Sequence, residues 1–139
     1  MSKKLVGIGI LVIVAAAIGT YFFQRGIGGE QSRAAAPVNV VEPAKLSLLE
    51  KEGRAVFQKN CRQCHGDQGE GTENGPPLIH GFYRPNHHAD GSFFLAVRNG
   101  VRAHHWNFGD MPAQPGVSDA DASKILVYIR RVQIASGIE

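Results

Sequence analysis

The chain has 139 residues, which is room for one domain with an accessory segment, and 43% apolar and 19% charged residues exclude a disordered chain. Its two cysteines, Cys61 and Cys64, are too few for a disulfide-rich scaffold or a four-cysteine metal site. The net charge of +3 resides in residues 1–45, whereas residues 46–139 carry ten basic and ten acidic side chains, so no nucleic-acid partner is predicted.

The N-terminal segment has the pattern of a membrane anchor. Residues 5–23 contain no charged side chain, and a helix over these 19 residues is about 28 Å long, close to the thickness of a bilayer's hydrocarbon core. Lys3 and Lys4 favour a cytoplasmic N-terminus. We predict a single transmembrane helix over residues 1–23, with the rest of the chain on the periplasmic side. A cleaved signal peptide is the alternative, although its apolar core is usually shorter.

Residues 24–45 are rich in Gly, Ala and Pro and show no sustained period. This composition predicts a flexible linker with a root-mean-square span of about 25 Å. The alternative is that the segment packs along the domain that follows.

Residues 46–139 are predicted to form an all-α domain, because helical periods are present and no useful strand alternation is. The first helix runs from about residue 48 to residue 60 or into the cysteines, and Ser47 with Glu50 fits a capping box at its start. Its apolar face is predicted to contain Leu49, Gly53, Val56, Phe57 and Cys61.

Two further helices follow. A short one is predicted over about residues 92–99, with Gly100 ending it, and a longer one over about residues 119–136, between the N-cap Ser118 and Gly137. The longer helix has an apolar stripe with Tyr128 beside it, made of Ala122, Ile125, Leu126, Ile129 and Val132. Gly- and Pro-containing loops are predicted over residues 66–84 and 101–117.

The pattern that carries chemistry is Cys61-Arg62-Gln63-Cys64-His65. C-x-x-C-H is the attachment signal for c-type haem: two thiols on one side of a helical turn add to the haem vinyl groups, and the histidine binds the iron. Three alternatives remain at this point. They are a redox dithiol, a zinc site completed by His87/His88 or His104/His105, and a chance match.

An electron-carrying haem iron needs a second axial ligand. Apart from the initiator, the chain has one methionine, Met111, which lies 46 residues after His65 in a Pro-bounded loop before the last predicted helix. A methionine in a polar loop is poorly explained by core packing. We therefore predict Met111 as the second ligand, with His65 and Met111 as the two metal-binding residues.

With these residues the chain resembles class I cytochromes c, particularly membrane-anchored bacterial monohaem forms, over essentially all of residues 46–139. In that family a Gly, an aromatic residue and the first haem cysteine are spaced as Gly53, Phe57 and Cys61 are, and the aromatic residue expected on the last helix is similar to Tyr128. The resemblance implies about three helices wrapped around one covalent haem c.

The resemblance also implies roles for two further residues. Gly75-Pro76-Pro77-Leu78 is similar to the family's Gly-Pro-x-Leu element, whose proline carbonyl accepts a hydrogen bond from the haem histidine, so Pro76 is expected to orient His65. Trp106 is expected either to contact a haem propionate through its indole N–H or to serve packing alone.

The histidines His80, His87, His88, His104 and His105 depart from the family pattern. Loop histidines are usually solvated, and two neighbours in one loop rarely point at one metal, so solvated side chains are expected here. An alternative iron ligand, which would lower the redox potential, and a copper or zinc site remain open.

The predicted function is a monohaem carrier of single electrons rather than an enzyme, because both axial positions are filled and no site is left for a substrate. Its partners would be respiratory redox proteins, with a quinol-oxidising complex or a dehydrogenase as donor and a terminal oxidase as acceptor. The alternative is a haem-c sensor, or an electron-transfer subunit of one dehydrogenase, with bis-histidine or open ligation.

Overall fold

The computed structural model describes residues 39–139, which form a helical domain with no strand among them. Its elements are α2 (Leu48–Asn60), α3 (Arg62–His65), the 3₁₀ helix η1 (Gly81–Tyr83), α4 (Asp90–Asn99) and α5 (Asp119–Ala135). The predicted anchor over residues 1–23 lies outside the described residues. Within residues 39–139, no helix is long and apolar enough to cross a membrane.

Helix α2 begins where its capping signal predicts. The Ser47 hydroxyl accepts from the Glu50 amide at 3.3 Å, and the Ser47 amide donates to the Glu50 carboxylate at 2.6 Å, which completes the capping box. The predicted inward face is confirmed at Gly53 and Phe57, which are buried, but Leu49 is 47% exposed. Leu49 lies one turn before the crossing with α5, so nothing covers it fully.

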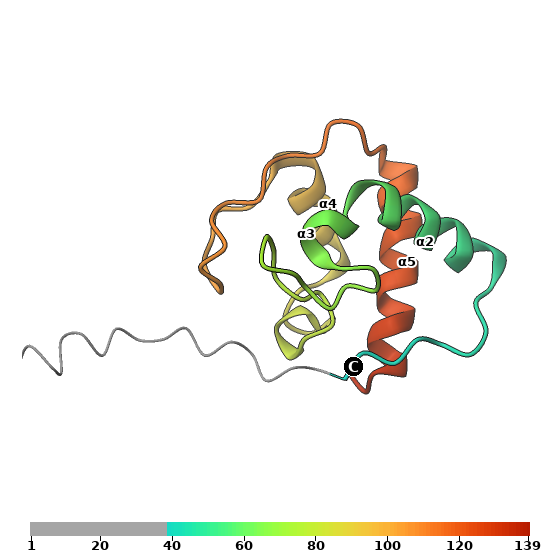
Figure 1. The fold of residues 1–139 in the computed structure, drawn as a ribbon. Coiled ribbons are helices and arrows are strands. Elements are labelled where there is room, and N and C mark those ends of the chain that lie inside the picture. The colour runs from blue at the N-terminus through green and yellow to red at the C-terminus, as the bar shows by residue number, and fades with distance from the viewer. Residues whose placement is uncertain (1–38) are drawn as a thin grey trace, which may run out of the picture. The chain divides into compact units, whose positions relative to one another are not determined.

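Helices α2 and α5 make the main contact of the fold and cross at Gly53 (green and red in Figure 1). A Cβ atom on Gly53 would collide with the Lys124 carbonyl oxygen and lie 3.0 Å from the Tyr128 Cβ. The rings of Phe57 and Tyr128 lie 5.8 Å apart between centroids, at 52°. A glycine is thus needed at this crossing, and the two aromatic rings pack beside it.

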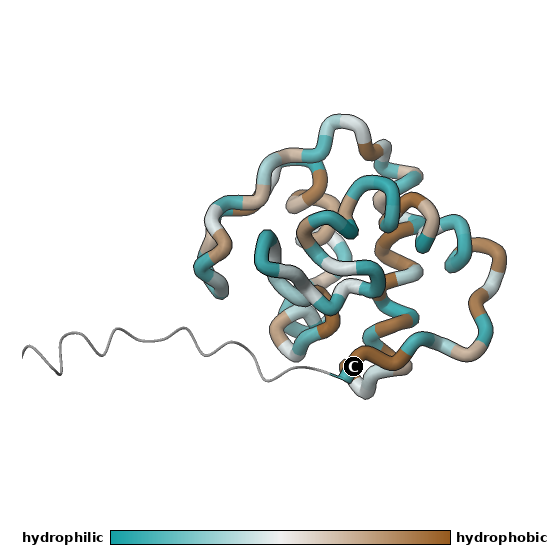
Figure 2. Tube along the Cα trace, viewed as in Figure 1, coloured by the Kyte–Doolittle hydropathy of each residue, from teal (hydrophilic) through white to brown (hydrophobic). Residues whose placement is uncertain are grey.

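The core lies on one side of α5, where Figure 2 shows apolar residues along the helix. The predicted stripe of α5 and Tyr128 are all buried, and so is Gln133. Phe57 from α2 and Ile79 from the loop before η1 form one buried cluster with four residues of α5, namely Ile125, Tyr128, Ile129 and Val132. The long helix therefore serves as the surface on which the loops are fixed.

Residues 39–45, the last part of the predicted linker, contact the domain. The Val41 amide donates to the Ser136 hydroxyl at 3.0 Å, Glu42 pairs with Arg54 at 2.6 Å, and Pro43 is buried. Figure 1 shows this segment running beside the C-terminus. These seven residues follow the alternative that the sequence leaves open, in which the segment packs along the domain, and residues 24–38 lie outside the described part of the chain.

Candidate functional site

The C-x-x-C-H motif lies at the junction of α2 and α3. The Cys61 amide donates to the Phe57 carbonyl at 2.7 Å, and the His65 amide donates to the Cys61 carbonyl at 3.0 Å, so the motif continues the helical path with a short break. Both thiols are free. Residues three apart on a helix share one side, and Cys61, Cys64 and His65 all line the same cavity.

The imidazole of His65 is oriented by one hydrogen bond. His65 is 8% exposed, and its Nδ1 lies 2.9 Å from the Pro76 carbonyl oxygen. A carbonyl only accepts, so Nδ1 carries the proton and Nε2 keeps its lone pair. Burial lowers the pKa of His65, and the contact with Pro76 opposes this. The result is a neutral imidazole whose Nε2 can bind a metal.

Gly75 sets the distance between the Pro76 loop and the motif. A Cβ atom there would lie 2.7 Å from the Cys64 carbonyl oxygen and 2.9 Å from the Cys64 Cβ, so no side chain fits. Thr72 adds a side-chain contact, donating from its hydroxyl to the Cys64 carbonyl at 2.8 Å. The loop is therefore packed directly onto the C-terminal end of the motif.

Met111 is held in place by a two-residue bridge across its loop. Its amide and its carbonyl each pair with Val101 at 2.9 Å, and Gly100, at φ +76°, lets the chain turn into this bridge. Met111 is half-buried and lines the cavity. The structure thus brings Met111 to the cavity that Cys61, Cys64 and His65 line.

Trp106 lines this cavity too, but its indole N–H donates to the Tyr83 hydroxyl at 3.0 Å. Tyr83 had no signal in the sequence, because it belongs to η1, a single turn without periodicity. Burial raises the pKa of Tyr83, and the Trp106 contact opposes this. The structure therefore gives the indole a protein partner.

The cavity has a volume of about 380 Å³ and a largely apolar wall. Phe57 and Ile129 come from the core, and Phe93 and Val97 come from α4. Burial, followed by the neighbouring Cys64, raises the pKa of the Cys61 thiol to about 11, so this thiol is protonated at neutral pH. Two thiols, a neutral imidazole and a thioether around an apolar cavity fit the donor set of a covalently attached haem.

The alternatives left open by the sequence are weakened by the same geometry. Within residues 39–139 there is no strand, so the context of a thioredoxin-like dithiol is lacking. In that part of the chain, the one group of three or more potential ligand side chains close enough to share a metal is His87, His88 and His105. The cysteines are not part of it, which argues against a mixed Cys/His zinc site.

The helices, the motif and the cavity together define a haem-binding protein of the c type. A family model described as cytochrome c matches residues 50–133, and the chain belongs to the cytochrome c family. Members of this family hold covalently bound haem c and transfer electrons, generally as carriers rather than enzymes. Comparison with curated proteins finds no match, and neither does comparison with solved structures.

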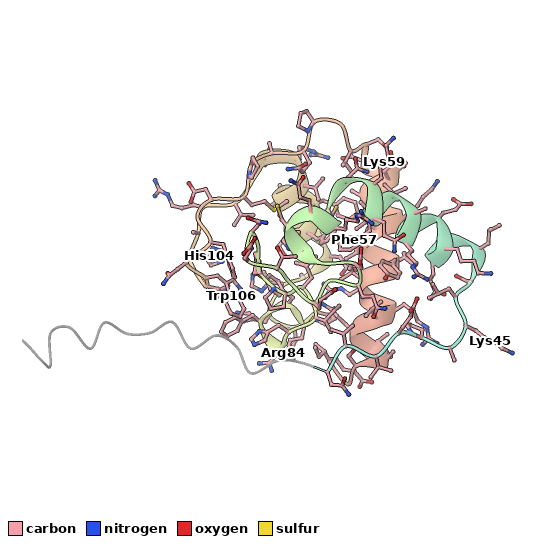
Figure 3. All side chains as sticks on the ribbon, viewed as in Figure 1. Lys45, Phe57, Lys59, Arg84, His104 and Trp106 are labelled. Carbon is pink, nitrogen blue, oxygen red and sulfur yellow. The ribbon has the colours of Figure 1, made fainter. Side chains whose placement is uncertain are left out.

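The two histidine pairs lie close together. His87 and His104 are exposed, as expected for solvated side chains, whereas His88 and His105 are half-buried. The ring centroids of His88 and His105 lie 5.3 Å apart, and those of His104 and His105 lie 4.2 Å apart. His88, His104 and His105 line the cavity as well. Figure 3 labels His104 and Trp106 on the loop between α4 and α5, which also carries His105. Two loops separated in sequence thus meet at one edge of the cavity.

Sequence reasoning also missed Arg130, which fastens one of these loops to α5. Its guanidinium donates to the carbonyl oxygens of Tyr83 at 2.5 Å and His88 at 2.6 Å, and it pairs with Asp90 at 2.9 Å. The Arg130 side chain is 16% exposed. In the sequence, Arg130 is visible only as a charged residue beside the apolar stripe of α5, and this position does not reveal which groups it contacts.

Proposed function

We propose that this chain is a membrane-anchored, monohaem c-type cytochrome that carries single electrons between respiratory redox partners, with His65 and Met111 as the axial iron ligands. The observation that carries the proposal is that Cys61, Cys64, His65 and Met111 line one largely apolar cavity. When bound, the haem supplies an iron that cycles between Fe(II) and Fe(III).

The chain's own residues account for binding and orientation. Cys61 and Cys64 would supply the sulfur atoms of the two thioether bonds. The hydrogen bond to the Pro76 carbonyl keeps the proton of His65 on Nδ1, which leaves the lone pair of Nε2 free to bind the iron. The bridge between Val101 and Met111 holds the thioether-bearing residue at the cavity. The apolar wall excludes water, and low solvent access raises the redox potential of a haem.

Membrane attachment, a periplasmic location and respiratory partners belong to the same proposal. They are supported by the uncharged run over residues 5–23 and the lysines before it. Residues 46–139 have no net charge, so docking would depend on the exposed edge of the haem and on small, weak interfaces rather than on a strong charge pattern.

The experiment that tests the ligation is the absorption spectrum of the oxidised, haem-attached protein and of Met111→Ala. We expect a thioether–iron charge-transfer band in the wild type and its loss in Met111→Ala, with covalent haem retained and a lower potential. His104→Ala is the matched variant from the same loop and should keep the band. A wild type without the band, or a Met111→Ala spectrum that is unchanged, would exclude Met111 as the ligand.

A further inference from the structure

The loop between η1 and α4 and the loop before Met111 place three imidazoles together. The ligand nitrogens of His87, His88 and His105 all lie within 4.8 Å of one another. His87 is exposed, and His88 and His105 are half-buried, so the group is reachable from solvent. None of the three is needed for the proposed His65/Met111 ligation.

Hydrogen bonding leaves the metal-binding nitrogen of His88 available. Its Nδ1 lies 2.5 Å from the Phe82 carbonyl oxygen, and since a carbonyl only accepts, Nδ1 carries the proton. Nε2 is then the ring nitrogen that can bind a metal ion. Metal-binding histidines usually donate their other ring N–H to a carbonyl or carboxylate in this way.

The backbone that carries His87 and His88 is fixed before any ion binds. Their amides both donate to the Arg84 carbonyl, at 3.0 Å and 2.8 Å. Arg130 binds the carbonyl oxygen of His88, and its charge is balanced by Asp90. A turn held in this way loses little conformational freedom when a ligand arrives.

His105 is positioned by aromatic packing rather than by a hydrogen bond. Its ring stacks on Phe82, with centroids 4.7 Å apart and planes at 25°. Phe82 is also the residue whose carbonyl orients His88. One residue therefore helps to position histidines from both loops.

The spacing requires only a small contraction. Imidazole nitrogens bound at about 2.0–2.1 Å to one tetrahedral ion are about 3.3 Å apart. Rotation of the exposed His87 ring and small shifts of the two half-buried rings would supply the remaining movement. Because the group contains no carboxylate, it suits ions that prefer imidazole, such as Cu²⁺ and Zn²⁺, and not Ca²⁺ or Mg²⁺.

We propose that His87, His88 and His105 form a second metal site, separate from the haem iron, which binds one divalent transition-metal ion through three imidazole nitrogens. Cu²⁺ should bind most tightly and Zn²⁺ next, following the usual order of divalent ions. A fourth coordination position is left for water. His88 and His105 also line the cavity, so the ion lies at the edge of the haem site. The site rests on the proposed ligation in one respect, since His105 can belong to it only if His105 is not itself an iron ligand.

The test uses the untagged, haem-attached, oxidised protein, since a histidine tag binds the same ions. Calorimetric titration with ZnCl₂ should give one ion per chain, and Cu²⁺ should give an electron paramagnetic resonance signal with splitting from imidazole nitrogens. His87→Asn and His105→Asn should each lower the affinity at least about tenfold. His87 does not line the haem cavity, so the haem spectrum of His87→Asn should stay unchanged.

His80→Asn is the matched control. The His80 ring accepts from the Phe82 amide at 3.2 Å, and an asparagine oxygen can keep this cap. Its metal affinity should equal that of the wild type. Three results would overturn the proposal: no stoichiometric binding, equal affinity in all variants, or loss of the low-spin haem spectrum in His105→Asn, which would make His105 an iron ligand. The nitrogen splitting in the wild type decides the matter even if a variant does not fold.

Discussion

Met111 and Val101 exchange both of their backbone hydrogen bonds, each at 2.9 Å, and this bridge is the one regular feature of the loop between α4 and α5. In a loop whose backbone is not held by hydrogen bonds, the methionine sulfur would not be kept at one position. The bridge, together with the Gln114 amide that donates to the Val97 carbonyl at 2.8 Å, ties the loop to the end of α4. The position of Met111 is thus determined by backbone pairing.

Gly100→Ala tests this bridge. A Cβ atom at Gly100 would lie 2.5 Å from the Met111 carbonyl oxygen, so the loop must move. We expect a weaker thioether–iron charge-transfer band and affinity of the ferric protein for cyanide raised at least about tenfold, which corresponds to about 1.4 kcal/mol.

Gly109→Ala is the matched control for that change. Gly109 lies in the same loop at φ +85°, close to the +76° of Gly100, but nothing lies within 4 Å of its Cβ position. Both variants place an alanine at a positive φ and so share a similar free-energy cost in the backbone, but only Gly100→Ala adds the collision with Met111. Equal cyanide affinity in the two variants would show that the bridge does not position Met111.

Gly53→Ala tests the crossing of α2 and α5. The added Cβ would collide with the Lys124 carbonyl oxygen, which belongs to the backbone of α5 and cannot rotate away. We expect a loss of about 1–3 kcal/mol in the free energy of unfolding, measured by guanidinium denaturation. Gly91→Ala in α4 has open space and should gain up to about 1 kcal/mol from helix propensity. A neutral Gly53→Ala would mean that the helices are not closely packed there.

Cys61→Ser and Cys64→Ser test the attachment. Each variant removes one of the two thiols that line the cavity, so neither can form two thioether bonds. Intact-mass measurement and acid extraction should show a protein with haem lost or held by a single bond. Haem held in both variants as firmly as in the wild type would contradict the assignment of these cysteines.

Stability should depend on pH through the histidine loops. Burial, and then charge on His104, His88, His87 and His80, lowers the pKa of His105 below the usual 6.5, and burial lowers that of His80. As the pH falls, His105 and His80 therefore bind protons at a higher pH in the unfolded chain than in the folded protein. The stabilisation is complete above pH 6.5 and is lost as the pH falls through the lowered pKa values.

The measurement is the free energy of unfolding of the haem-attached protein between about pH 8 and pH 5, with a chelator present to remove metal ions. We expect a decline on the acid side that is shallower in His105→Asn, since that variant lacks one of the groups that titrate. Identical slopes in the two proteins would show that His105 is not perturbed.

Local signals predicted the helices well. The capping box at Ser47, the N-cap at Ser118 and the period of α5 each depend on residues within a few positions, and all are present as predicted. Helix α4 begins at Asp90, two residues before the predicted start, because its N-cap Ala89 has no side chain that can signal a cap. The turn η1 was missed because a single turn of helix has no periodicity in the sequence.

Relations between loops were beyond the reach of local patterns. His88 and His105 meet because Arg130 and Phe82 hold two loops in place, and no period in the sequence links these residues. The same holds for Trp106, whose partner Tyr83 lies 23 positions away. The hydrogen bond between Val41 and Ser136 joins residues 95 positions apart, which no local pattern could predict.

The central claim is that this chain carries single electrons on a covalently held, His65/Met111-ligated haem. The most direct test is a potentiometric titration of the haem-attached protein followed by absorption. The account predicts one reversible one-electron transition, in which a low-spin c-type spectrum with a thioether–iron band in the oxidised form converts to the reduced c-type spectrum. A protein without a haem spectrum, or one whose haem shows no reversible one-electron transition, would contradict it.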